Sequence, residues 1–312
     1  MQRRLHTDWQ LQFRMFFTMA LLAVLYLVFA VILARSGVGF PLIVIIVGGL
    51  ALAQYYYSDR LVLASTGARL VSESELPQVH DAVGRLAAMA NLPKPRVALI
   101  RSPMPNAFAT GRNPKTAVIA VTSGLLDRLQ PGELEAVLGH EMTHIHNHDM
   151  TVMAMASFFA TIAAVIVQNA FFLSLFGGLG GGGFGGGNRR RGDSVGLVIV
   201  VSLLVYFISF LLVSALSRYR EYAADRGSAL LTGRPADLAS ALMRISGSMA
   251  RIPTRDLRTV QHANAMFIIP AAVGQGGMME LFMTHPSLEH RLNQLRRIER
   301  QLAEAGIGGH RA

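Results

Sequence analysis

Four stretches of this 312-residue chain contain no charged side chain and run for about 20 residues or more. A helix of about 20 apolar residues crosses the hydrocarbon core of a bilayer. Only 15% of the residues are charged, whereas an ordinary soluble domain carries about 25%. The sequence therefore predicts a mainly α membrane protein with four transmembrane helices, at roughly Met15–Ala34, Val38–Tyr57, Met150–Leu175 and Val195–Ser217.

The arginines predict the orientation of these helices, because an excess of Lys and Arg marks the cytoplasmic side. Three arginines precede the first stretch, but only Arg35 separates it from the second. The N-terminus is therefore expected inside, and the net charge of +10 indicates a membrane rather than nucleic acid as partner. Arg189–Arg191 would then lie outside. Either the first pair dominates the topology, or the third and fourth stretches dip into the bilayer without crossing it.

The apolar stretches divide the chain into four parts. Residues 1–57 hold the first helix pair and 150–217 the second, with a glycine-rich loop at 177–194 that reads as a flexible linker. The alternative for the third and fourth stretches is a buried helical hairpin in a soluble core, considered chiefly for the third, which contains Gln168 and Asn169 near its end. The remaining segments, 58–149 and 218–312, are each small, so we expect them to pack together as one domain.

Periodicity predicts a mixed first segment and a helical second segment. Apolar spacing favours helices at 75–90 and 132–147, and alternating or β-branched runs favour extended segments at 96–101, 106–110 and 116–122. In the second segment, helical spacing covers residues 218–231, 236–247 and 288–304.

His140-Glu141-Met142-Thr143-His144 is the first chemically informative motif. Residues four apart share a helix face, so both imidazoles can point at one metal ion. The chain has no cysteine, and a metal site must therefore use histidines and carboxylates. Two imidazoles suit zinc and leave room for a third ligand and water, while Glu141 can accept a proton from that water.

A second motif follows the fourth apolar stretch, where Glu221 and Asp225 lie four residues apart on one predicted helix. Glu221 is able to complete the zinc ligands, and Asp225 to hold one ligand imidazole through its other nitrogen. The alternative is a pair of solvent-exposed acids neutralised by the arginines at positions 218, 220 and 226.

Taken together, the two motifs and the apolar stretches resemble the HtpX-type membrane zinc proteases, relatives of the CAAX prenyl endopeptidase. The segments 106–111 and 121–126 are also similar to segments that precede the zinc helix in that family. The resemblance implies a zincin-like α+β catalytic domain with a small sheet. It also implies one Zn²⁺ per chain held by His140, His144 and Glu221, with Glu141 as catalytic base.

The same resemblance implies a biological setting. The family acts in quality control of misfolded or damaged membrane proteins, in stress response, and is known for cutting its own chain. Its active site faces the cytoplasm, which here predicts a multi-pass protein of the bacterial inner membrane. The oligomeric state is not predicted.

Two histidines outside the motif need separate treatment. His285, in Thr284-His285-Pro286-Ser287, resembles the family pattern and is our candidate for stabilising the oxyanion, with Arg291 as a weaker one. The alternative for His285 is a turn residue that caps the helix beginning near Ser287. His148 lies four residues after His144 and is a minor alternative as a zinc ligand.

The residues Asn106, Ala107, Phe108 and Ala109 are predicted to bind substrate as an edge strand. An extended peptide pairs with such a strand through main-chain hydrogen bonds, which tolerates many sequences. The alternative is a plain loop between Pro105 and Gly111.

The sequence thus predicts a zinc endopeptidase of unfolded or membrane protein substrates. The runner-up is a CAAX-type prenyl-protein peptidase, although those enzymes have more spans. A different class is a divalent-metal transporter, but ion sites of transporters lie near the bilayer midplane, and no ionisable residue lies mid-stretch here. An inactive scaffold would lack a ligand or the base, and none is missing.

Overall fold

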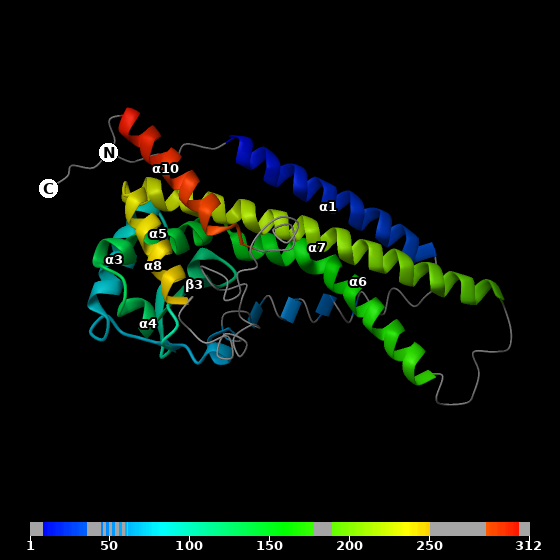
Figure 1. The fold of residues 1–312 in the computed structure, drawn as a ribbon. Helices are drawn as coiled ribbons and strands as arrows, with labels where there is room; N and C mark the ends of the chain where they lie inside the picture. The colour runs from blue at the N-terminus through cyan, green and yellow to red at the C-terminus, as the bar shows by residue number, and fades with distance from the viewer. Residues whose placement is uncertain are drawn as a thin grey trace.

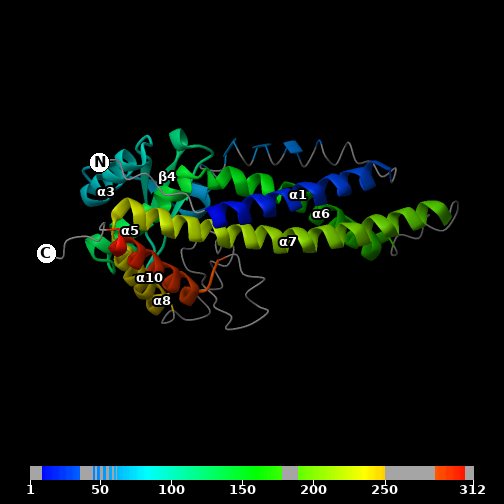
Figure 2. The ribbon, with the colours of Figure 1, turned by 90° about the horizontal axis from the view of Figure 1, so that it is seen from above.

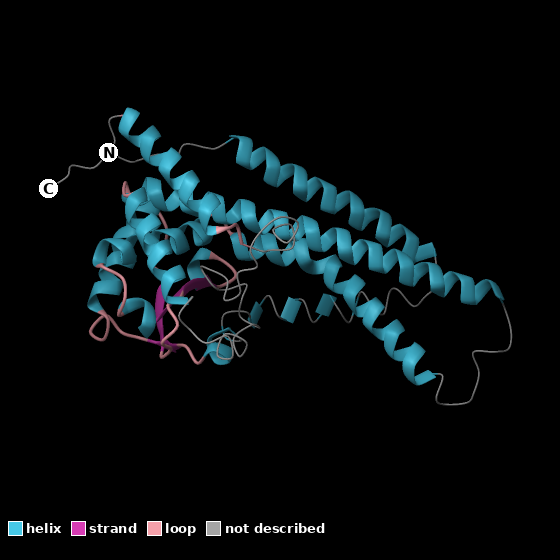
Figure 3. Ribbon diagram, in the orientation of Figure 1, coloured by secondary structure: helices cyan, strands magenta, loops and turns pink. Residues whose placement is uncertain are grey.

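The structure is a computed structural model that describes residues 9–35, 62–177, 189–249 and 285–305, with single positions between 45 and 60. Long helices extend from a mixed domain that carries the small sheet (Figures 1 and 3).

The described elements are α1 (Trp9–Arg35), β1 (Arg69–Leu70), α3 (Pro77–Ala90), β2 (Arg96–Ile100), β3 (Ala107–Thr110), η1 (Pro114–Thr116), β4 (Val118–Thr122), α4 (Ser123–Leu126), α5 (Pro131–His146), α6 (Asp149–Gly177), α7 (Arg189–Thr232), α8 (Pro235–Met249) and α10 (Leu288–Glu304).

Helices α1, α6 and α7 pack along one another away from the domain, as Figure 2 shows from above. Their common core is apolar, and large side chains on their outer faces are exposed, as lipid-facing helices require. The core comprises Leu22, Tyr26 and Phe29 from α1, Ala156, Ile162 and Ala163 from α6, and Val198, Val205 and Leu216 from α7.

Two described helices are long and apolar enough to cross a bilayer, Trp9–Ile32 with mean hydropathy 2.7 and Leu197–Thr232 with mean hydropathy 2.8. A third span would be the bent pair Asp149–Phe158 and Ala160–Gln168. The protein is thus mainly helical with two or three candidate spans. The predicted span Val38–Tyr57 lies largely outside the described residues, so four spans are not shown.

Helix α7 differs most from the sequence prediction. The fourth apolar stretch and the helix expected at 218–231 are one continuous helix of 44 residues. It begins at Arg189, so residues 189–194 are helical and do not belong to the glycine-rich loop, whose positions 178–188 lie outside the described residues. A helix satisfies its own backbone in lipid and in water alike, and a change in composition at Ser217 therefore requires no break.

The sheet has the order β1-β2-β4-β3, with β2 and β4 parallel and the other pairs antiparallel. Strand β3 therefore lies at one edge. Ala107, Ile119 and Val121 join the main core with α3 and α5, whereas Phe108, Val118 and Ala120 face the other side. The expected extended segments are confirmed, and β1 is an addition.

Helix α5 passes through the middle of the domain between α3, α7 and α8. Its crossing with α7 is close because glycines occupy it. A Cβ at Gly139 would lie 3.1 Å from Ser228 Oγ, and one at Gly227 would overlap the side chain of Thr143. Ser228 also donates a hydrogen bond to the Ala136 carbonyl at 2.6 Å. This contact brings the α7 segment that contains Glu221 against the face of α5 that carries the histidines.

Candidate metal centre

The motif histidines lie on α5, which starts in a well-defined way. Pro131 occupies its first turn, and Gln130 and Glu133 form a reciprocal capping box, a common helix start. The carboxylate of Glu133 is further held by Ser240 at 2.5 Å and by Arg244 at 2.7 Å, both from α8. The helix is thereby fixed against its neighbour before it reaches the site.

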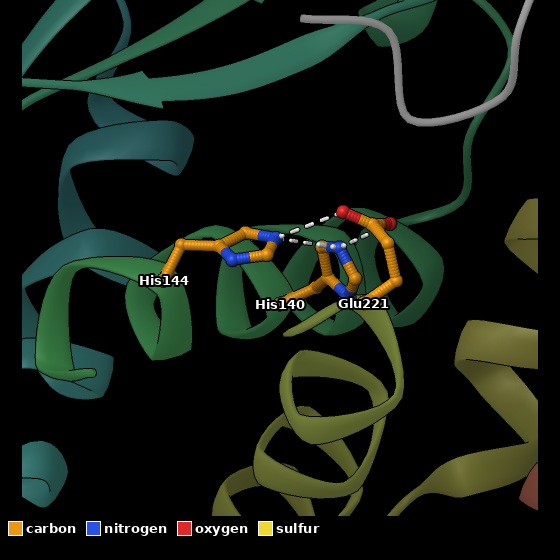
Figure 4. Close-up of side chains that lie close together, drawn as sticks. All are labelled: His140, His144 and Glu221. Carbon is orange, nitrogen blue, oxygen red and sulfur yellow. Dashed lines mark hydrogen bonds and ion pairs between the residues drawn. The ribbon is translucent and has the colours of Figure 1, made fainter. Parts of the chain in front are cut away.

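His140, His144 and Glu221 converge as Figure 4 shows. The Nε2 atoms of the two histidines are 3.2 Å apart, and Glu221 lies 3.6 Å from His140 Nε2 through Oε2 and 3.5 Å from His144 Nε2 through Oε1. Four ligands at tetrahedral angles around zinc, with bonds near 2.0–2.1 Å, are separated by about 3.3 Å. The three side chains therefore fit one zinc ion.

The other nitrogen of each imidazole faces a carboxylate. His140 Nδ1 lies 3.0 Å from Asp225 Oδ1, and His144 Nδ1 lies 2.5 Å from Asp149 Oδ2. With a proton on each Nδ1, both Nε2 lone pairs point at the shared position, which is the tautomer that a metal needs. The donor arrangement thus supports the same conclusion as the distances.

Two buried arginines hold the carboxylates. Arg291, from α10, donates to Asp225 through Nε at 2.8 Å and Nη2 at 2.6 Å, and its Nη1 lies 3.4 Å from Glu221 Oε2. Arg220 Nε lies 3.1 Å from Asp149 Oδ1. Helices α5, α6, α7 and α10 therefore all meet at this centre.

The electrostatics favour a positive charge where the ligand atoms converge. Burial alone lowers the pKa of His140, but Asp225 and Glu221 outweigh it and raise that pKa to about 9. Burial raises the pKa of the Glu141 carboxyl. The neighbouring acids thus account for the shift at His140 and burial accounts for the shift at Glu141, and a divalent cation is a stabilising partner for buried carboxylates.

Glu141 connects the metal centre to the sheet. Its side chain is buried, and Oε2 accepts a hydrogen bond from the Ala109 backbone N–H at 2.8 Å. Amides of a strand alternate in direction, and Asn106 is bonded to Thr122 of β4. Ala107 and Ala109 therefore present their N–H and C=O groups to the free edge of β3, beside Glu141.

His285 is also brought to the centre. It is 5% exposed, and its Nδ1 lies 3.5 Å from Glu221 Oε2. Among the described residues neither ring nitrogen makes a hydrogen bond. The cap of α10 is instead Ser287, whose Oγ accepts from the His290 N–H.

His148 is exposed and outside the metal cluster, so the alternative of His148 as a ligand is wrong.

Asp149 is a site residue that the sequence analysis did not predict. It follows His144 by five residues, beyond the end of α5. No helical spacing rule connects the two positions, since a turn intervenes.

The sequence of the chain is also similar to those of known proteins. Residues 73–299 match Peptidase family M48. The chain belongs to peptidase family M48. A protease HtpX homolog of Moorella thermoacetica is 58% identical over 97% of this chain and 99% of its own length. Protease HtpX homolog 2 of Methanosarcina acetivorans is 52% identical over 97% and 100%, and protease HtpX homolog 1 of Streptomyces coelicolor is 49% identical over 99% of each.

Among solved structures, the M48 peptidase resembles the crystal structure of S. mikatae Ste24p with a TM-score of 0.54 and 18% identity. The match covers 88% of this chain and 62% of Ste24p. It shows a shared fold.

Family and geometry together establish a zinc metallopeptidase of the M48 family and a membrane protein, with His140, His144 and Glu221 as the zinc site. The resemblance to HtpX-type proteases is confirmed. The transporter and scaffold alternatives lose their basis.

Proposed function

We propose that this M48 peptidase hydrolyses peptide bonds with Glu141 as the general base. The observation that carries the proposal is the position of the Glu141 carboxylate, buried between the zinc ligands on α5 and the free edge of β3. A general base must lie within reach of both the water it deprotonates and the substrate. Asp225 and Arg291 keep His140 oriented toward the metal.

When bound, zinc supplies Lewis acidity that acidifies water and polarises the scissile carbonyl. The chain's residues then move the proton. Glu141 accepts it from water as the carbonyl is attacked, and donates it to the departing amide nitrogen. The Ala109 N–H bond to Oε2 holds the carboxylate in place for both transfers.

His285 is proposed to donate a hydrogen bond to the oxyanion. Both of its nitrogens are without a hydrogen bond among the described residues. The three guanidinium nitrogens of Arg291, by contrast, are all directed at Asp225 and Glu221. Of the two candidates, His285 therefore has the free donor.

Strand β3 is proposed to bind the substrate by adding it as a fifth strand. The outward N–H and C=O of Ala107 and the outward C=O of Ala109 would align an extended peptide beside Glu141, and the bonds of Asn106 to Thr122 anchor the strand. Main-chain pairing suits a protease of varied substrates.

Those substrates are proposed to be unfolded or misfolded membrane proteins, including the chain itself, at the cytoplasmic face of a bacterial inner membrane. The support is the continuous helix α7, in which Glu221 follows the uncharged stretch of a candidate span within about one helical turn, and the arginine distribution. CAAX-type prenyl peptidase activity is the second candidate, and the fold shared with Ste24p favours testing it.

The decisive test uses purified wild type and Glu141→Gln in mild detergent. The variant should retain stoichiometric zinc and cut an unfolded protein about 10²–10⁴-fold more slowly, because only the proton acceptor is lost. Chelator should stop the wild type. Unchanged cutting by Glu141→Gln would refute the base assignment, and selective cutting of a prenylated peptide would favour the second candidate.

A further inference from the structure

The metal centre is connected to the membrane helices through the start of α6. Asp149 lies in the first turn of α6 and is 1% exposed. One of its oxygens binds the zinc ligand His144 and the other lies 3.1 Å from Arg220 of α7. The position of His144 therefore depends on where α6 begins relative to α7.

The same part of α6 is held at its other end by α1. The hydroxyl of Tyr26 donates a hydrogen bond to the Ala156 carbonyl at 2.7 Å, in the interior of the bundle. This bond ties the middle of α1 to α6 directly before the point where α6 bends.

At this position α6 is bent by 40° between Asp149–Phe158 and Ala160–Gln168. Insertion of a side chain into the helical hydrogen-bond ladder is an established cause of such bends. Tyr26 is 6% exposed and packs with Phe29 and Ile162. The position is therefore too buried for a water molecule to take over the hydrogen bond of the Tyr26 hydroxyl.

We propose that Asp149–Phe158 is a rigid link between the membrane bundle and the zinc site, with Tyr26 and Asp149 as positioning residues at its two ends. Without the Tyr26 hydroxyl, α6 loses its hydrogen bond to α1 beside the bend and can straighten. Its first turn then shifts, and the carboxylate of Asp149 no longer orients His144. This inference rests on the zinc ligands and not on the hydrolytic mechanism.

The test measures zinc affinity by competition with a chromophoric chelator, for Tyr26→Phe, Asp149→Ala and the double variant. Loss of a carboxylate that orients a ligand histidine weakens metal binding about 10–100-fold, so that range is expected for Asp149→Ala. For Tyr26→Phe we expect a rise in zinc Kd of about 2–10-fold, the value of one hydrogen bond. Tyr206→Phe, at an exposed position of α7, is the matched control and should leave the Kd unchanged.

The double variant decides whether the two residues act through one link. If they do, Tyr26→Phe adds nothing once Asp149 is absent, and the two effects are non-additive. The visible spectrum of the cobalt-loaded Tyr26→Phe protein should also change, since it reports ligand geometry. Additive effects, or a Tyr26→Phe protein with wild-type Kd and spectrum, would overturn the proposal. Should Asp149→Ala not fold, Asp149→Asn serves in the same cycle. Loss of proteolysis by Tyr26→Phe with normal zinc binding would also overturn the proposal, and would indicate a role in the hydrolytic mechanism instead.

Discussion

At the scale of single residues, the geometry of the metal centre depends on which nitrogen of each ligand imidazole faces a carboxylate. Asp225 and Asp149 take the Nδ1 atoms of His140 and His144, and Glu221 lies opposite both Nε2 atoms. A neutral imidazole has one donor and one acceptor. The acids therefore set the direction of the lone pairs as well as the position of the rings.

His285→Ala is predicted to lower kcat about 10²–10³-fold, because one donor to the oxyanion is lost. Zinc content should remain that of the wild type, since the described zinc ligands are other residues. Steady-state kinetics on an unfolded protein together with metal analysis check both points. His148→Ala, at an exposed position, is the control. Loss of zinc from His285→Ala would show a structural role.

At the scale of elements, the edge position of β3 leads to a sharp test. Ala107→Pro removes one outward N–H, and proline is tolerated at an edge strand when its nitrogen faces away from the ladder. Cleavage of peptides should weaken about 2–10-fold, mainly through KM, since one main-chain hydrogen bond is lost. Ala107→Gly, which keeps the N–H, is the comparison. Equal KM values for both variants would refute pairing along this edge.

Elements also show how far the sequence alone leads. His140 and His144 were predictable because helical geometry places residues four apart together, and the same holds for Glu221 and Asp225. The Asp149–His144 contact crosses the end of α5. The bond from Tyr26 to Ala156 joins positions 130 residues apart. Such contacts depend on how helices pack, and no local spacing encodes that.

The continuity of α7 was missed for a different reason. The apolar stretch ends at Ser217, and the sequence analysis therefore placed the end of one helix and the start of another there. A change from apolar to polar residues does not by itself end a helix. The glycine contacts at Gly139 and Gly227 that set the α5–α7 distance likewise become meaningful only once both helices are in place.

At the scale of the whole molecule, the zinc ligands join distant parts of the chain. His140 and His144 come from the segment before α6, and Glu221 and Arg291 from the segment after it. Zinc is therefore predicted to stabilise the folded protein against separation of these parts, by about 2.7 kcal/mol when its free concentration is 100 times Kd.

Thermal unfolding in detergent, followed at increasing zinc concentration and one fixed scan rate, checks this prediction. The apparent Tm should rise with zinc for the wild type. It should rise much less for Glu221→Gln, which loses a ligand charge. A Tm independent of zinc in the wild type would contradict a cross-linking role.

The single rod formed by α7 has one more consequence. Glu221 follows Ser217, the last position of the uncharged stretch, by only four positions, which at 1.5 Å per residue is about 6 Å along the helix. With no hinge between them, we expect the zinc site to keep a fixed distance from the end of the uncharged stretch. If a substrate is anchored in the same bilayer, the distance of a peptide bond from the membrane would then decide whether it can be cut.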